Sequence, residues 1–352
     1  MTGSSGKRSA PGPGWQPVSV SAHGTTAHSV TGPCTSGLSA MSARSMRILV
    51  IGAGGFVGRA LCQRLFNQGH QVIGLSRSMR PETTVNRWSQ VQATLDDHQV
   101  LQRALDQVDQ VFHLAWDTTP GTSASQPSLE VSNNLLPSMR LLEAMQERRG
   151  LPLIFMSSGG ALFRGDGNKA LHEDMPLQPR SYYGAGKVAM EAFLQAFAQR
   201  NDSPVVLLRA SNLYGPGQRA KRQFAIVPTL FDCLKRKRPF EIWGDGSAVR
   251  DFLFIEDFLD CCERLLDWSA PAAKTTAFNL GSGTGTSINA LCDHVESVSG
   301  LKLERDYRPE RGVDNGFVTM DTRRVGEQLG WQASTTLDAG LRQTWAWIRD
   351  FE

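Results

Sequence analysis

Short apolar runs recur along the chain and are separated by polar or glycine-rich stretches. The run 47–51 is mostly aliphatic and has no helical period of 3.6 residues, so it predicts a parallel strand buried on both faces. Runs at 71–75, 110–116 and 153–156 predict further strands, and the last of them leads into a turn of serine and glycine residues. His113 lies inside an apolar run and is expected to be a packed core residue.

Apolar residues at helical spacing predict helices after several of these strands. One predicted helix follows residue 58, one opens near residue 183, and one closes the chain between residues 337 and 348. The chain has 352 residues, of which 40% are hydrophobic, and this is enough for one large α/β domain and a smaller lobe.

Residues 1–45 are rich in Ser, Gly, Thr, Pro and Ala and carry no apolar periodicity, so they predict a disordered extension. They lack the apolar core of a signal peptide. They are poor in acids and rich in Ser, as a transit peptide is, but they show no amphipathic helix. Two other interpretations of this segment are favoured over a transit peptide: it is a cloning extension, or the protein starts at Met41 or Met46.

The net charge of +3 arises in residues 1–46, which hold Lys7, Arg8 and Arg44 and no acid; the remainder has 34 basic and 34 acidic residues. This balance gives no electrostatic case for a nucleic-acid partner. The six cysteines form no Cys-x-x-Cys pair, which favours reduced thiols in a cytoplasmic enzyme over disulfides or a metal site. No apolar run approaches the roughly 20 residues that span a bilayer.

Three glycines, Gly52, Gly55 and Gly58, follow the strand 47–51 and precede a helix. In such a turn the first glycine allows a sharp bend, the second lets the backbone approach a pyrophosphate, and the third lets helix and strand pack closely. A glycine triplet alone marks any tight turn, but strand, turn and helix together predict a dinucleotide site that also includes Phe56 and Val57. The Gly-x-x-Gly-x-x-Gly spacing resembles the fingerprint of the extended short-chain dehydrogenase/reductases, the nucleotide-sugar epimerase/dehydratase family.

The end of the second strand normally carries the residue that reads the adenosine ribose, an Asp or Glu in NAD-binding proteins. This chain has Ser76 and Arg77 there, with Arg80 further on. A guanidinium pairs with a 2′-phosphate, so these residues slightly favour NADP over NAD. The alternatives are that Arg77 is a solvated loop residue and that NAD binds without the usual acid.

Tyr183 and Lys187 are four residues apart and therefore share one helix face, and Tyr183 lies 25 residues after Ser158. A phenol has a pKa of about 10 and is a poor base at neutral pH unless a nearby ammonium stabilises its phenolate. Such a pair could remove the hydroxyl proton of a sugar while its carbon gives up hydride. Tyr-x-x-x-Lys is by itself an ordinary helix pattern, but the glycine turn and the serine turn upstream make chance improbable.

Ser157, Ser158, Tyr183 and Lys187 make the resemblance to the extended short-chain dehydrogenases firm, because they match the Ser-Tyr-Lys catalytic set of that family. Ser158 is favoured over Ser157 as the active hydroxyl. The resemblance also implies that Leu114, Ala115 and Asn134 bind the cofactor. The chain departs from the family at Trp116, Pro137-Ser138 and Gly186, and it has Gly159-Gly160 where dehydratases carry an Asp-Glu pair.

The blocks 208–219, 243–257 and 278–283 resemble the family's substrate segments. This resemblance implies that Asn212 and Arg250 contact the diphosphate of a nucleotide sugar, with Arg311 as a further cation, and guanidinium forks suit a diphosphate. A structural ion pair is the alternative role for Arg250.

The resemblance implies a doubly wound parallel Rossmann sheet with a smaller C-terminal α/β lobe. The expected division is an NAD(P)-binding domain over 46–208, with a segment near 250–268 returning to it, and a nucleotide-sugar lobe over most of 209–352. The favoured function is C4 epimerisation of a nucleotide sugar by a homodimer that retains its cofactor, which would then be NAD. A carbonyl reductase using NADPH and a non-catalytic NADP sensor are the alternatives.

Overall fold

A computed structural model describes residues 44–78, 88–164, 167, 169–220, 225–310 and 316–351. The predicted disordered extension lies outside these residues except for its last two positions. Arg80 and Arg311 also lie outside them.

The predicted doubly wound sheet is confirmed. Seven strands pair in parallel in the order β10-β6-β5-β4-β1-β2-β3. They are β1 (Arg47–Ile51), β2 (Gln71–Ser76), β3 (Ser89–Gln92), β4 (Gln110–His113), β5 (Leu153–Met156), β6 (Val205–Ala210) and β10 (Thr275–Leu280). The strand order reverses between β1 and β4, where open α/β sheets bind their ligands.

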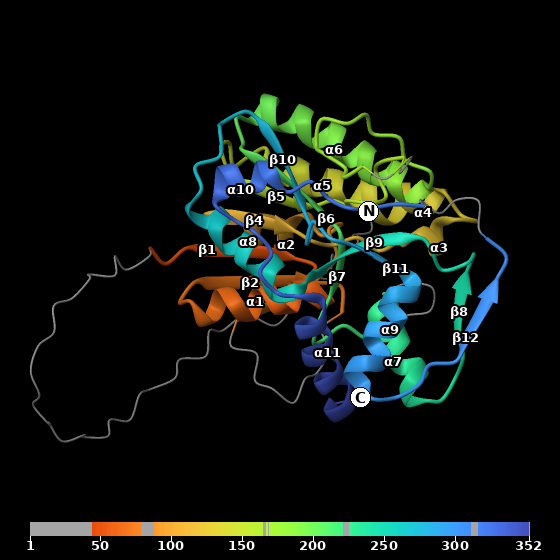
Figure 1. The fold of residues 1–352 in the computed structure, drawn as a ribbon. Helices are drawn as coiled ribbons and strands as arrows, with labels where there is room; N and C mark the ends of the chain where they lie inside the picture. Colours follow the sequence, from red (N-terminus) through yellow and green to blue (C-terminus); the bar gives the residue numbers. More distant parts are fainter. Residues whose placement is uncertain are drawn as a thin grey trace, which may run out of the picture. The chain divides into compact units, whose positions relative to one another are not determined.

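Helices cover both faces of this sheet, and Figure 1 shows them on either side of the strands. Side chains of β1 alternate between two cores: Ile48 and Val50 pack in one, Leu49 and Ile51 in the other, and all four are buried. This alternation explains why the run 47–51 is apolar throughout. The helices of the Rossmann part are α1 (Phe56–Asn67), α2 (His98–Leu105), α5 (Leu136–Met145), α6 (Tyr182–Asn201), α8 (Ile255–Asp267) and α10 (Arg323–Leu329).

The connection between β4 and α5 is built from short turns. It contains α3 (Pro120–Ser123), α4 (Ser128–Glu130) and a π-helix, η1 (Val131–Leu135), which runs directly into α5. π-helical turns are rare and frequently occur at functional sites.

Two small sheets and three helices form the C-terminal region. β7 (Asn212–Tyr214), β9 (Val249–Phe254) and β11 (Gly285–Ser287) make one sheet, and β8 (Phe240–Trp243) pairs with β12 (Arg305–Arg308). The helices are α7 (Ile226–Lys235), α9 (Ile288–Ser299) and α11 (Leu337–Phe351). Strand β10 joins the large sheet, so the return to that sheet extends to residue 280, beyond the expected 250–268. The domain boundary near residue 208 stays a prediction.

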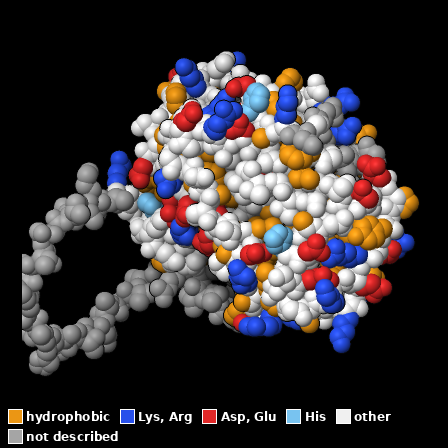
Figure 2. Space-filling view, in the orientation of Figure 1, with side chains coloured by type: hydrophobic (Ala, Val, Ile, Leu, Met, Phe, Trp, Pro, Cys, Tyr) orange, Lys and Arg blue, Asp and Glu red, His pale blue; other side chains and the backbone are white. Residues whose placement is uncertain are grey.

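Acidic and basic side chains are interspersed over the face shown in Figure 2. The five cysteines in the described part of the chain are buried free thiols. Among the described helices, none combines the length and apolar character that crossing a bilayer requires.

Candidate active site

The three glycines of the first turn lie where the carboxyl ends of β1 and β4 meet. Gly52 has a φ of 95°, and a Cβ there would lie 2.8 Å from the backbone nitrogen of Ala115, which follows β4. A Cβ on Gly58 would overlap the carbonyl oxygen of Gly52. A side chain at either position would therefore push α1 or the end of β4 out of place.

Among the described residues, no side chain caps the backbone N–H groups at the N-terminus of α1. The N-cap residue is Gly55, which has no side chain to accept a hydrogen bond, and the first turn carries no acidic residue. Phe56 and Val57 open this turn. A helix N-terminus of this kind attracts anions, so these residues fit the pyrophosphate of a dinucleotide.

The end of β2 contains an ion pair that sequence reasoning missed. Arg77 binds the carboxylate of Asp117, and Asn133 donates to the second oxygen of that carboxylate over 2.9 Å. Asp117 follows β4, which pairs with β1 on the side opposite to β2. The Arg77 guanidinium, which was expected to bind a 2′-phosphate, is therefore already paired with the carboxylate of Asp117. Only the strand order brings these two residues together.

Tyr183 and Lys187 lie in the first two turns of α6, whose N-cap Ser181 accepts a hydrogen bond from the Gly184 backbone over 3.1 Å. The Lys187 ammonium is buried; it donates to the Met156 carbonyl over 2.7 Å and lies 5.9 Å from the centre of the Tyr183 ring. Burial lowers the pKa of Lys187 to about 7, and nearby carboxylates oppose this. Burial raises the pKa of Tyr183 to about 12, against a hydrogen bond to Ser158 that lowers it.

The two candidate serines have different partners. Ser158 shares a hydrogen bond with Tyr183. Ser157 is buried and donates to Glu191 of α6 over 2.6 Å. The geometry therefore supports the preference for Ser158, whereas the Ser157 hydroxyl is used in a contact that stabilises the end of β5.

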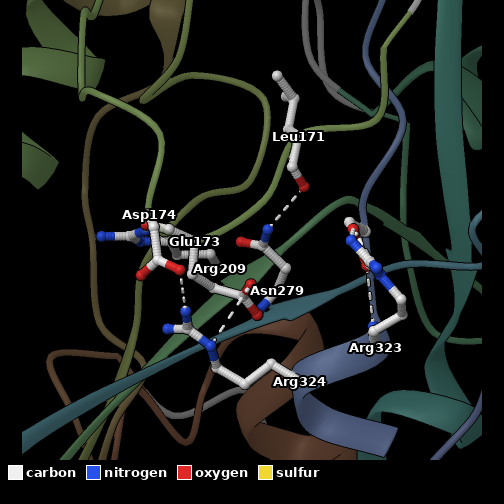
Figure 3. A network of polar contacts seen from close by, with 8 residues as sticks. Leu171, Glu173, Asp174, Arg209, Asn279, Arg323 and Arg324 are labelled. Carbon is white, nitrogen blue, oxygen red and sulfur yellow. Dashed lines mark hydrogen bonds and ion pairs between the residues drawn. The ribbon is translucent and has the colours of Figure 1, made fainter.

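A buried ion pair lies behind Ser157. Arg209 of β6 donates through two nitrogens to Glu191, over 3.1 and 2.7 Å, and through a third to the backbone oxygen of Glu173 over 2.9 Å. Figure 3 shows the outer part of this network, where Asn279 donates to the Leu171 carbonyl and Arg324 binds Asp174. This polar network joins β6, β10, α6 and α10 around the turn that holds both serines.

Asn134 lies in η1 and is buried. Its side-chain oxygen accepts from the Asp117 backbone over 2.7 Å, and its nitrogen donates to Thr118 over 2.8 Å and to Glu130 over 3.1 Å. It therefore anchors the loop after β4, the backbone of which was predicted to line the cofactor at Leu114 and Ala115. Leu114 itself is held to β1 by a 2.9 Å bond to the Ile51 carbonyl.

His113 is buried, as expected of a core residue, and one ring nitrogen lies 2.9 Å from the Ser138 hydroxyl. Burial lowers its pKa to about 3, so the ring is neutral at physiological pH.

The structure brings two of the three expected substrate residues onto neighbouring strands. Asn212 opens β7, and Arg250 lies in β9, which pairs with β7. Asn212 donates to the backbone oxygen of Asp251 over 2.9 Å, which fixes the two strand ends to one another. Arg250 is partly buried and donates to its neighbour's carbonyl over 2.9 Å. Arg311 lies outside the described residues, so its role stays a prediction.

Known proteins resemble this chain over nearly all of its described length. A model of the NAD dependent epimerase/dehydratase family matches residues 48–281. The UDP-glucose 4-epimerase of Mycolicibacterium smegmatis is 30% identical over 313 residues, which cover 87% of this chain and 99% of that protein.

Solved structures give the same picture. The UDP-glucose 4-epimerase of Thermotoga maritima, solved with UDP-glucose, superposes with a TM-score of 0.80 at 28% identity, covering 86% of this chain and 99% of that one. MoeE5, solved with UDP-glucuronic acid and NAD, superposes with a TM-score of 0.79 at 30% identity, with the same coverage.

Proposed function

The chain belongs to the NAD-dependent epimerase/dehydratase family and is an NAD(P)-dependent enzyme, and from this premise we propose that it is a C4 epimerase of a nucleotide diphosphate sugar. The observation that carries the proposal is the grouping of Ser158, Tyr183 and Lys187 beside a turn without carboxylates. A Cβ on Gly159 would lie 2.9 Å from the Met320 side chain. A side chain at this position would therefore require the end of Met320 to shift, and neither Gly159 nor Gly160 supplies the acid or base of a dehydratase.

Each of the three side chains has a distinct task in this proposal. Tyr183 removes the proton from the sugar O4 and later returns it, while Ser158 orients that oxygen through its hydroxyl. The Lys187 ammonium stabilises the phenolate of Tyr183, which burial would otherwise disfavour. The bound nicotinamide would supply the remaining chemistry by accepting hydride from C4 and returning it to the opposite face.

Asn212 and Arg250 are proposed to bind the diphosphate. An amide donor and a guanidinium fork on adjacent strands are suited to phosphate oxygens, which accept several charge-assisted hydrogen bonds. The relative from Mycolicibacterium smegmatis makes UDP-glucose the first substrate to test.

We propose NAD as the cofactor, although Ser76 and Arg77 alone favoured NADP. Asp117 neutralises Arg77 and would repel a 2′-phosphate placed between them. Fluorescence titration of cofactor-free protein is expected to give tighter binding of NADH than of NADPH. The D117N variant is expected to have a smaller difference between these two affinities. Tighter NADPH binding by the wild-type protein would contradict this choice.

The function is tested by proton NMR of purified protein with UDP-glucose and no added nicotinamide. The C4 epimer is expected to appear, because the enzyme carries its own cofactor. The Y183F variant is expected to be slower by about 10²- to 10⁴-fold, while Y182F, which changes the exposed neighbouring phenol, keeps its activity.

A reductase is the second candidate, because the same grouping of Ser158, Tyr183 and Lys187 could also serve the reduction of a carbonyl. If no epimer forms, the same sample receives NADPH and a 4-keto sugar nucleotide. Oxidation of NADPH under these conditions would replace the epimerase proposal.

We also propose a homodimer formed through α5 and α6. Four large apolar side chains are exposed on these helices or directly before them: Val131, Leu136, Tyr182 and Phe193. A groove of about 500 Å³ between the helices is lined by Met139, Leu142, Phe193 and Phe197, among others. Light scattering is expected to find a dimer that F193E dissociates, whereas F351E, at an exposed position in α11, leaves it intact.

A further inference from the structure

Glu130 is a buried carboxylate that no sequence motif marks. It ends α4 immediately before the π-helix, and only 4% of its surface is exposed. Its Oε2 accepts a hydrogen bond from Asn134 over 3.1 Å, whereas its Oε1 is buried and has no hydrogen-bond partner among the described residues. A half-satisfied buried carboxylate is costly, so its presence calls for a compensating role.

Glu130 packs against the helix that carries the catalytic pair. A Cβ on Gly186 would lie 2.7 Å from Glu130 Oε2, 3.3 Å from Glu130 Cβ and 3.3 Å from the Trp116 ring. Gly186 therefore makes room for the carboxylate and the indole, one residue before Lys187. Trp116 and Gly186 are two of the positions at which the chain departs from its family's pattern, and the structure places them around one side chain.

The same group of side chains surrounds the Lys187 ammonium. The Trp116 ring centre lies 3.9 Å from Lys187 Nζ, and the Phe155 ring centre lies 4.6 Å away. The titratable and charged neighbours are Glu130 on α4, Tyr183 and Glu191 on α6, and the neutral His113 on β4. Glu191 is already bound by Arg209 and Ser157. Among the described residues, Glu130 is thus the carboxylate near Lys187 that no arginine engages.

We propose that Glu130 is a positioning residue for the catalytic pair, and that its carboxylate keeps the buried ammonium of Lys187 charged. This rests on the proposed roles of Tyr183 and Lys187. Aromatic rings exclude water from the ammonium and stabilise it by cation–π contact, but burial still favours the neutral amine. Burial lowers the pKa of Lys187 to about 7, and the charges of Glu191 and, to a smaller extent, Glu130 raise it. Without that charge, a larger fraction of Lys187 would be neutral at physiological pH.

The charge of Glu130 has a defined effect on both members of the pair. A negative charge raises the pKa of every neighbouring group, and it raises the pKa of Lys187 and of Tyr183 alike. Removing it must therefore move both titrations to lower pH. A residue that served only to pack the helices would lower activity at every pH and leave the profile where it is.

The first test measures the titration of Lys187 directly, without turnover. In protein labelled with ¹³C-lysine, the Cε resonance of Lys187 is assigned by its loss in K187R and followed against pH. The E130Q variant keeps the size of the side chain and is expected to titrate about 1 pH unit below wild type. E130D, which keeps the charge, and E327Q, which removes an exposed carboxylate on α10, are expected to titrate as wild type.

The second test is a thermal-unfolding cycle that probes the packing of Glu130 on Gly186. G186A is expected to lower the Tm of the wild-type protein, because its Cβ would lie 2.7 Å from Glu130 Oε2. The same substitution is expected to lower the Tm less in the E130A background, where that oxygen is absent. This cycle needs neither cofactor nor substrate.

The outcomes separate the proposal from the proposed function. A Lys187 midpoint that is unchanged in E130Q would overturn the proposed effect of Glu130 on Lys187, and equal costs for G186A in both backgrounds would overturn its packing against Gly186. A shifted midpoint in a protein that epimerises no sugar would leave this role in place and refute the epimerase alone. With an active enzyme, both limbs of the pH–rate profile of E130Q are expected to move to lower pH together.

Discussion

The buried ion pair between Arg209 and Glu191 is expected to dominate the stability of the site region. The two side chains are 7% and 5% exposed, and three nitrogens of Arg209 are bound to Glu191 and to the Glu173 carbonyl. The R209M variant replaces the guanidinium by an apolar chain of similar length. Among the described residues, it leaves the buried Glu191 carboxylate with the Ser157 hydroxyl as its hydrogen-bond donor.

The expected cost follows from this geometry. Removing one partner of a buried ion pair costs about 3–5 kcal/mol of unfolding free energy. With about 2 °C of Tm per kcal/mol for a large chain, R209M is expected to melt about 6–10 °C below wild type. The double variant R209M/E191M removes both charges and is expected to recover about half of this loss. It keeps a cost of about 1–3 kcal/mol for the unpaired Ser157 hydroxyl and Glu173 carbonyl.

The assay is equilibrium unfolding in urea, with Tm from calorimetry as a second readout. R349M removes the guanidinium of an exposed ion pair with Asp350 and serves as the matched control, with no measurable change expected. The reasoning would be refuted if R209M were as stable as wild type, or if the double variant lost the sum of the two single losses.

The glycine turn and His113 each give a further prediction. G58A places a Cβ on the Gly52 carbonyl and is expected to weaken NADH binding at least about tenfold in a fluorescence titration, whereas G316A, at a position with open space, binds normally. Because burial lowers the pKa of His113 from its ordinary value of 6.5 to about 3, the unfolded chain binds more protons than the folded protein between these values. The unfolding free energy that this residue contributes is therefore lost as the pH falls below about 6.5, by up to about 1.4 kcal/mol per pH unit. Urea unfolding of H113N should show a shallower acid dependence. An unchanged slope in H113N would contradict the burial argument.

Short-range patterns determined much of this protein from its sequence. The strand at 47–51, the glycine turn and the i, i+4 spacing of Tyr183 and Lys187 are all set by neighbours within a few residues. Each carries its own physical signal, an apolar run, a φ that only glycine adopts easily, or a shared helix face. These patterns predicted buried parallel strands and a dinucleotide turn, and the family resemblance that they carry implied the doubly wound sheet and the catalytic set.

Contacts between distant segments were decided only by the tertiary structure. The Arg77–Asp117 pair depends on β1 lying between β2 and β4, and the Ser157–Glu191–Arg209 network depends on α6 covering β5 and β6. Glu130 beside Gly186 lies across a helix interface that no local pattern marks. Local spacing limits which side chains share a strand or helix face. The order of strands and the packing of helices, which many weak contacts set together, decide which charges meet across those faces.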